Sequence, residues 1–225
     1  MAERREQLVA EMIAIGRRLY ARGLIVATEG NFAVRLSEDR LLATASGVCK
    51  GELQPEDLVE VDLAGQPRGG HRRVSTEIAL HLEVFRQRPD VQASLHAHPP
   101  HCIALTLLGR SLDRAVLAEN VVLLGKVPLA RYATPGTPAI ADSIRPFIRQ
   151  TDCILLERHG SLSVGQSLTE AFYKLETMEH TAMSYLHALQ IGEVRELARE
   201  EIVLLQKMRR AVYGLTTPFI PFVEE

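Results

Sequence analysis

Several residue types that would narrow the possibilities are scarce in this sequence. Among its 225 residues there is no tryptophan, aromatic residues make up 5%, and the three cysteines, Cys49, Cys102 and Cys153, form no C-x-x-C pair. An odd number of widely separated cysteines gives neither a disulfide framework nor zinc-finger spacing. We therefore expect reduced thiols with a structural role.

Charge of one sign and long hydrophobic runs are also missing. The chain has 26 Lys and Arg against 28 Asp and Glu, a net charge of −2, and no basic run exceeds two residues. This balance argues against a nucleic-acid or membrane-surface role. No stretch approaches the roughly 18 apolar residues of a membrane span. The first residues begin an amphipathic pattern rather than an apolar signal core, which predicts a cytoplasmic protein.

What the chain does have is the hydrophobic periodicity of a mixed α/β protein. With 46% hydrophobic residues it is long enough to bury one core, so a single domain over 1–225 is expected. Alternating apolar positions predict strands over 32–36, 41–45, 59–63, 91–98, 121–124, 127–130, 153–156 and 161–164.

Helical spacing and capping residues predict the helices. Ser75 is a good N-cap, and Ser167-x-x-Glu170 forms a capping box. The predicted helices cover about 8–19, 75–86, 138–144, 167–186 and 194–212. Helices around a sheet that contains several hairpins predict an α/β fold whose sheet is at least partly antiparallel.

The pair His96-x-His98 is the sharpest chemical feature. On a strand, alternate side chains share a face, so the two imidazoles could bind one Zn²⁺. The same spacing also occurs by chance, as a pair of surface or structural histidines. His159, which follows an apolar strand and precedes Gly160, is a candidate third ligand, although taken alone it fits a structural role better than a functional one. The other histidines are interpreted as non-ligands: His71, His81, His101, His180 and His187.

Three short segments could bind an anion. Ser75-Thr76-Glu77 begins a predicted helix, where free N–H groups and hydroxyls can hold a phosphate. Gly30-Asn31 and Ser46-Gly47 lie in loops at strand ends and could present backbone N–H groups. Ordinary capping and turn formation explain each segment as well. None matches a P-loop or a dinucleotide-binding fingerprint, so a nucleotide is not expected.

Taken in order, these segments resemble the class II aldolase/adducin family, and within it the fuculose-phosphate aldolase branch. The matching pieces run over almost the whole chain: Thr28-x-Gly30-Asn31, Ser46-Gly47, Ser75-Thr76-Glu77, Arg88-Pro89-Asp90, His96-x-His98, Tyr132-Ala133-Thr134-x-Gly136-Thr137, His159-Gly160 and Tyr213-Gly214-Leu215. The resemblance implies a three-layer α/β/α fold with a central, largely antiparallel sheet. It also implies a homotetramer with active sites between neighbouring subunits.

The resemblance further implies a role for each matching residue. His96, His98 and His159 correspond to the ligands of one Zn²⁺ per subunit, and Glu77 corresponds to the catalytic acid/base, which can also ligate the resting metal. The phosphate pocket corresponds to Gly30, Asn31, Ser46, Gly47, Ser75 and Thr76. Tyr213 corresponds to a tyrosine that reaches the active site from the C-terminal end. The implied reaction is reversible cleavage of a ketose 1-phosphate to dihydroxyacetone phosphate and a small aldehyde.

Two positions depart from that branch and keep other reactions open. Leu117 replaces a tyrosine on the aldehyde side, and Pro135 replaces an aromatic residue. Glu119 in the same stretch could move protons or be a solvated loop acid. The alternatives are sister enzymes, namely a pentulose-phosphate 4-epimerase, a methylthioribulose-phosphate dehydratase or a sugar-acid-phosphate decarboxylase. An adducin-like interaction module without catalysis is a further alternative, but it would not need the histidines and Glu77.

Overall fold

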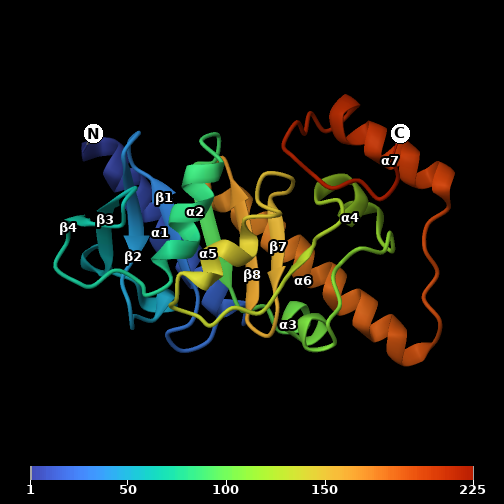
Figure 1. The fold of residues 1–225 in the computed structure, drawn as a ribbon, viewed down its shortest axis with the longest axis horizontal. Coiled ribbons are helices and arrows are strands. Elements are labelled where there is room, and N and C mark those ends of the chain that lie inside the picture. Colours follow the sequence, from blue (N-terminus) through green and yellow to red (C-terminus); the bar gives the residue numbers. More distant parts are fainter. Residues whose placement is uncertain (1, 225) are drawn as a thin grey trace.

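The computed structural model describes residues 2–224, and its centre is one eight-stranded sheet (Figure 1). The strands follow the order β4-β3-β2-β1-β5-β8-β7-β6. They are β1 (Asn31–Arg35), β2 (Arg40–Thr44), β3 (Leu58–Asp62), β4 (Pro67–Gly69), β5 (Ala93–Ala97), β6 (Leu129–Ala130), β7 (Cys153–Leu156) and β8 (Gly160–Gly165). Every neighbouring pair is antiparallel except β6 with β7. The predicted antiparallel character of the sheet is confirmed.

Helices cover both faces of this sheet. They are α1 (Ala2–Ala21), α2 (Ile78–Gln87), α3 (Pro100–Leu107), α4 (Ala118–Leu123), α5 (Ala139–Ile144), α6 (Leu168–Ile191) and α7 (Arg199–Ala211), with short 3₁₀ turns at Lys50–Glu52 and Pro55–Asp57. Helices α1 and α3 pack with α6 on one face, and α2 packs with α5 on the other (Figure 1). The fold therefore has the expected three layers.

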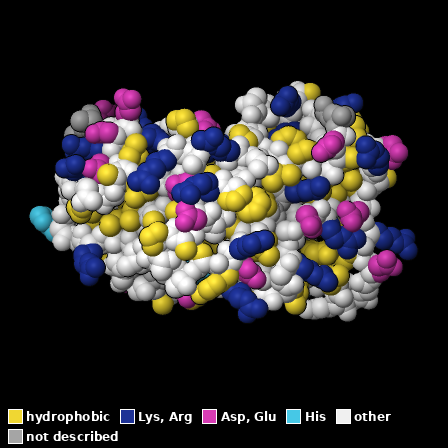
Figure 2. All heavy atoms as spheres, viewed as in Figure 1, with side chains coloured by type: hydrophobic (Ala, Val, Ile, Leu, Met, Phe, Trp, Pro, Cys, Tyr) yellow, Lys and Arg dark blue, Asp and Glu magenta, His cyan; other side chains and the backbone are white. Residues whose placement is uncertain are grey.

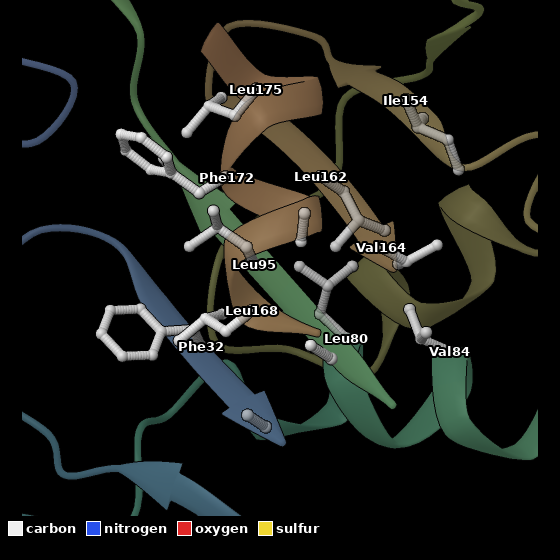
Figure 3. Close-up of a cluster of buried hydrophobic side chains, with 14 of the residues drawn as sticks. Phe32, Leu80, Val84, Leu95, Ile154, Leu162, Val164, Leu168, Phe172 and Leu175 are labelled. Carbon is white, nitrogen blue, oxygen red and sulfur yellow. The ribbon is translucent and has the colours of Figure 1, made fainter. Parts of the chain in front are cut away.

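The core fills the space between the sheet and its helices. Figure 3 shows Leu80 of α2 and Phe172 of α6 among side chains from the central strands. All five residues of β5 are buried, because helices lie over both of its faces. Burying one such leucine or phenylalanine side chain contributes about 1.5–3 kcal/mol to folding. This packing fixes the position of β5, which carries His96 near its end.

The predicted strand 121–124 is wrong, because these residues belong mainly to α4. A short apolar run has no periodicity that separates a strand from a buried helical turn. The helix predicted from Ser75 begins later, at Ile78. The Ser75 hydroxyl still accepts a hydrogen bond from the Glu77 N–H, at 3.2 Å, so it orders the turn that precedes the helix. Helix α3 was not predicted, although its first residue, Pro100, suits a helix start.

The C-terminal part of the chain is anchored by a buried arginine. The Arg209 side chain donates to the backbone oxygens of Val122 and Leu123 at 2.7 and 2.8 Å, and to Thr217. These bonds hold α7 against α4 and the segment that follows α7. Figure 1 shows α7 at the end of the molecule opposite β3 and β4.

The surface agrees with the balanced composition. On the face shown in Figure 2, Lys and Arg side chains are interspersed with Asp and Glu. Within residues 2–224, no helix has both the length and the apolar character needed to cross a membrane.

Candidate metal centre

Strand pairing brings three distant histidines together. His96 lies in β5, His98 follows the end of that strand, and His159 directly precedes β8. Strands β5 and β8 are antiparallel neighbours, with Ala97 opposite Ser161. The end of β5 therefore meets the start of β8, and the imidazole centroids lie 4.5–5.0 Å apart.

The donor atoms of these rings converge with the Glu77 carboxylate. The Nε2 atoms of His96 and His98 are 3.0 Å apart. Glu77 lies 3.2 Å from His159 Nε2 through Oε1 and 3.6 Å from His96 Nε2 through Oε2. One nitrogen from each ring falls within a group whose members are no more than 4.8 Å from one another. Among the described residues, this is the one group of three or more such side chains able to hold a metal ion.

Burial favours the neutral form of two of these imidazoles. It lowers the pKa of His96 well below its usual value, and the neighbouring His98 and His159 lower that pKa further. Burial also lowers the pKa of His159, against the opposing effect of Glu77. A neutral imidazole keeps the lone pair that a metal ligand needs.

A buried hydrogen-bond network orients Glu77. Asn31 Nδ2 donates to Glu77 Oε2 at 2.7 Å, and Asn31 Oδ1 lies 2.7 Å from His81 Nε2. Because that amide oxygen can only accept, His81 Nε2 carries the proton, and His81 Nδ1 accepts from the Ser94 hydroxyl at 2.7 Å. Burial lowers the pKa of His81 to about 3, so this ring is neutral. Two hydrogen bonds, through Asn31, therefore link His81 to Glu77, and His81 is not one of the converging groups.

Backbone strain occurs on both sides of the centre. Ala27 (φ 48°) and Arg158 (φ 55°) are the non-glycine residues with positive φ among those described. Arg158 immediately precedes His159, and Ala27 lies in the loop between α1 and β1 that leads to Asn31. Such conformations cost about 1–3 kcal/mol each and concentrate at functional sites.

Four loop segments meet beside this centre. A bridge between Ala45 and Val74 brings Ser46-Gly47 next to Ser75-Thr76. A Cβ on Gly136 would lie 3.6 Å from Thr76. The ammonium of Lys50, which is 2% exposed, donates to the backbone oxygens of Thr28 and Val48 and so links two of the loops. Five of the six expected phosphate-binding residues, all but Asn31, thus lie in adjoining loops. Within residues 2–224, none of their side chains is hydrogen-bonded to the three histidines.

Asn31 is expected to bind phosphate, but its side-chain amide already has two partners. Its Nδ2 donates to Glu77 and its Oδ1 lies against His81. Gly30, beside it, has φ 69°, and a Cβ there would lie 2.7 Å from Ile25. Glycine is therefore required at this position by both conformation and space.

A family model described as the Class II Aldolase and Adducin N-terminal domain matches residues 10–186. The chain belongs to the class II aldolase and adducin family.

Members of this family with different reactions are similar to the chain over most of its length. It is 31% identical to a 3-oxo-tetronate 4-phosphate decarboxylase of Pectobacterium atrosepticum, covering 87% of this chain and 91% of that protein. It is 34% identical to a methylthioribulose-1-phosphate dehydratase of Methylococcus capsulatus, covering 78% and 91%. A solved L-fuculose 1-phosphate aldolase superposes with a TM-score of 0.83 at 30% identity, covering 89% and 95%. The relatives are enzymes, and they establish a metal-dependent lyase family rather than one specific activity.

The donor set of this family member suits a divalent metal ion. Three imidazole nitrogens and one carboxylate are the ligand types that Zn²⁺ prefers. Glu77 Oε1 and His159 Nδ1 are buried without a hydrogen-bond partner in the described structure. A ligand bond at Glu77 Oε1 would satisfy one of these buried polar atoms.

The remaining predicted residues lie apart from the centre. Tyr213 follows α7, is 54% exposed and has no side-chain hydrogen bond within residues 2–224. Leu117 is half-buried at the start of α4, Glu119 is exposed in its first turn, and Pro135 is exposed in a loop. The protomer alone does not bring Tyr213 to the histidines.

Sequence reasoning missed the contacts of Glu29, His81 and Lys50. Glu29 Oε2 lies 2.9 Å from His98 Nδ1. The pairing of Asn31 with His96 would have suggested this contact, because it brings the residues just before β1 close to those just after β5. Without the register, Glu29 was only a loop acid in the sequence.

Proposed function

We propose that this protein is a zinc-dependent aldolase that reversibly cleaves a ketose 1-phosphate, such as L-fuculose 1-phosphate, to dihydroxyacetone phosphate and a small aldehyde. The observation that carries the proposal is the convergence of His96, His98 and His159 nitrogens with the Glu77 carboxylate. A non-catalytic interaction module would not need this arrangement.

His96, His98 and His159 would hold the ion, and Glu77 could complete its resting coordination. When bound, Zn²⁺ would supply Lewis-acid stabilisation of the negative charge that develops when the carbon–carbon bond of the ketose breaks. The histidines contribute three nitrogen ligands at fixed positions. Because these residues are far apart in the sequence, the three ligands come together only when the sheet is folded.

Glu77 would move the proton. In the cleavage direction it delivers a proton to the carbon that has lost its bond, which yields dihydroxyacetone phosphate. In the condensation direction it removes that proton. Asn31 holds Oε2 by a 2.7 Å hydrogen bond, which leaves Oε1, the oxygen without such a partner, available for this transfer.

The adjoining loops would bind the phosphate. Backbone N–H groups at Gly30 and Gly47, and the hydroxyls of Ser46, Ser75 and Thr76, provide donors without net charge. The Lys50 ammonium links two of these loops through the backbone oxygens of Thr28 and Val48, and so adds a positive charge beside them. Asn31 would add its second amide hydrogen, since the first is used by Glu77.

A second candidate function is decarboxylation of a sugar-acid phosphate or dehydration of methylthioribulose 1-phosphate. Relatives with these names cover most of the chain, and Leu117 and Pro135 alter the side that would hold the aldehyde. Aldol cleavage and decarboxylation both leave a carbanion beside a carbonyl group. The same metal and Glu77 could therefore serve either reaction.

Product analysis tests these alternatives. Zinc-loaded protein is incubated with L-fuculose 1-phosphate, 5-deoxyribulose 1-phosphate, methylthioribulose 1-phosphate and 3-oxo-tetronate 4-phosphate, and the products are identified by NMR. Dihydroxyacetone phosphate from a ketose 1-phosphate supports the aldolase. Release of carbon dioxide, or loss of water from a ketose whose carbon–carbon bonds stay intact, would replace the aldolase proposal with the corresponding sister reaction. Inversion of a stereocentre in a substrate would identify an epimerase.

We further propose a homotetramer in which Tyr213 serves the site of a neighbouring subunit. Its exposure and its place after α7, outside the group of converging histidines, support this assignment. Sedimentation of the active protein as a tetramer, together with lower turnover for Tyr213→Phe, is the expected result. A strictly monomeric active species would contradict it.

A further inference from the structure

Glu29 has a contact that the proposed reaction does not use. Its carboxylate Oε2 lies 2.9 Å from His98 Nδ1, on the side of the imidazole opposite the converging Nε2 atoms. The Glu29 side chain is 44% exposed, whereas that of His98 is 17% exposed. Glu29 thus lies outside the candidate metal position and behind one of its ligands.

The three candidate ligand histidines differ in what their other nitrogen contacts. His96 Nδ1 lies 2.9 Å from the backbone oxygen of Ser161. His159 Nδ1 is buried and has no partner in the described structure. Among the three, only the Nδ1 of His98 has a carboxylate partner within residues 2–224. His98, like His159, lies just outside a strand, whereas His96 lies within β5.

The backbone places Glu29 at this position. Asn31 pairs with His96 across β1 and β5, so Glu29, two residues before Asn31, lies near His98, two residues after His96. The His98 N–H donates to the Leu24 oxygen at 3.0 Å, which keeps the end of β5 close to the segment before β1. The turn at Ala27 and the positive φ of Gly30 lie on either side of Glu29. The backbone around both residues therefore brings the Glu29 side chain within hydrogen-bond reach of His98.

We propose that Glu29 is a positioning residue for the metal centre: it accepts a hydrogen bond from His98 Nδ1 and thereby directs the Nε2 lone pair toward the ion. A carboxylate acceptor fixes the tautomer with hydrogen on Nδ1, orients the ring and makes the opposite nitrogen more basic. The inference rests on the metal site of the proposed function.

Zinc affinity tests the inference without reference to turnover. Metal-stripped full-length protein competes with a chromophoric chelator for Zn²⁺, and the dissociation constant is compared among the wild type, Glu29→Ala, Glu29→Gln and Glu56→Gln. Glu56 is an exposed acid with no side-chain hydrogen bond or salt bridge in the described part of the chain, so its variant is the matched control.

Glu29→Ala should weaken zinc binding by about 10–100-fold, the usual effect of losing such an outer partner. Glu29→Gln should be intermediate, because its amide oxygen still accepts from Nδ1 but carries no charge. Glu56→Gln should match the wild type. Circular dichroism of the metal-free proteins checks folding, and Glu29→Gln carries the test if Glu29→Ala does not fold.

Two results would overturn the inference, and they are distinguishable. Tight zinc binding by the wild type with equal affinity in both Glu29 variants would remove Glu29 as a positioning residue and leave the proposed metal site intact. Failure of the wild type itself to bind zinc would remove both. Inorganic phosphate binding provides a further check: weaker phosphate binding with unchanged zinc affinity would assign Glu29 to the loop structure instead.

Discussion

Two buried carboxylates, those of Asp152 and Glu77, have contrasting surroundings. Asp152 Oδ1 lies 2.9 Å from the Arg88 guanidinium, and Oδ2 lies 2.8 Å from the Lys174 ammonium. The Glu77 side chain is similarly buried, at 12% exposed against 7%, but contacts two imidazoles and an amide. Among the described residues, no lysine or arginine forms a salt bridge with it.

The contrast separates a structural charge from a functional one. A buried carboxylate is costly unless it is paired, and the chain itself supplies the cations for Asp152. For Glu77 it supplies neutral donors that would share a metal ion with it. The buried Lys50 and the largely buried Lys174 follow the same division. Neighbouring Asp152 and Glu170 outweigh the effect of burial and raise the pKa of Lys174, whereas burial lowers the pKa of Lys50 to about 8.

The largest expected effect comes from removing a ligand of the Glu77 cluster. His96→Ala should lose stoichiometric zinc and reduce turnover to the background rate, because two imidazoles and one carboxylate hold the ion poorly. Metal analysis and steady-state kinetics measure both. His180→Ala, which changes an exposed histidine on α6, should keep both properties. Normal zinc content in His96→Ala would contradict the assignment of His96 as a ligand.

Removing the Glu77 charge while keeping its shape should affect turnover and spare metal binding. Glu77→Gln should retain zinc and slow kcat by about 10²–10⁴-fold, as expected for a lost general acid/base. The assay is the product measurement described above, at saturating substrate. Wild-type kcat in this variant would exclude Glu77 from proton transfer.

The same carboxylate-to-amide change at the other cluster should affect stability instead. Asp152→Asn removes the carboxylate that Arg88 and Lys174 share, although each cation keeps a second partner, Asp90 and Glu170 respectively. The variant should lower the free energy of unfolding by about 1.5–3 kcal/mol, the usual effect of losing hydrogen bonds to a charged group. In metal-free protein, Glu77→Gln should change this quantity by less than about 1 kcal/mol, since no built-in cation loses its partner. Urea unfolding in the presence of a chelator compares the two variants. Equal losses would remove the distinction between the clusters.

The smallest effect concerns the pH dependence of stability. Burial lowers the pKa of Lys50 in the folded protein to about 8, against 10.5 for an ordinary lysine, so between these values the unfolded chain binds more protons than the folded one. The contribution of Lys50 to the free energy of unfolding should therefore increase as pH rises from about 8 to about 10.5, by roughly 1–3 kcal/mol. The free energy of unfolding of the wild type minus that of Lys50→Met, both measured in metal-free protein, should therefore increase over this pH range. A difference that stays constant with pH would contradict the lowered pKa.

Much of the fold was predictable because its signals are local. The alternating residues of β1, β2 and β3, and the capping box at Ser167, mark elements that the structure contains. Residues 121–124 could not be assigned from their four apolar side chains. Their helical form depends on packing against α7, which the Arg209 hydrogen bonds secure.

The candidate site was predictable as a set of residues but not as a geometry. Spacing indicated the His96 and His98 pair, whereas His159 and Glu77 were assigned from the family resemblance, and the structure places both beside that pair. The partners of these residues, Glu29 on His98 and Asn31 on Glu77, depend on strand register. Register is set by the packing of the whole sheet, so no short segment contains it.

The pairing of β5 with both β1 and β8 has a consequence for folding. A shift of β8 by one residue would send alternate side chains to the opposite face, and the imidazole that precedes this strand would move away from the other two. An ion that needs all the donors would bind the correctly aligned sheet and stabilise it relative to misaligned, near-native forms. Zinc would then stabilise the native strand alignment in addition to its proposed role in the reaction.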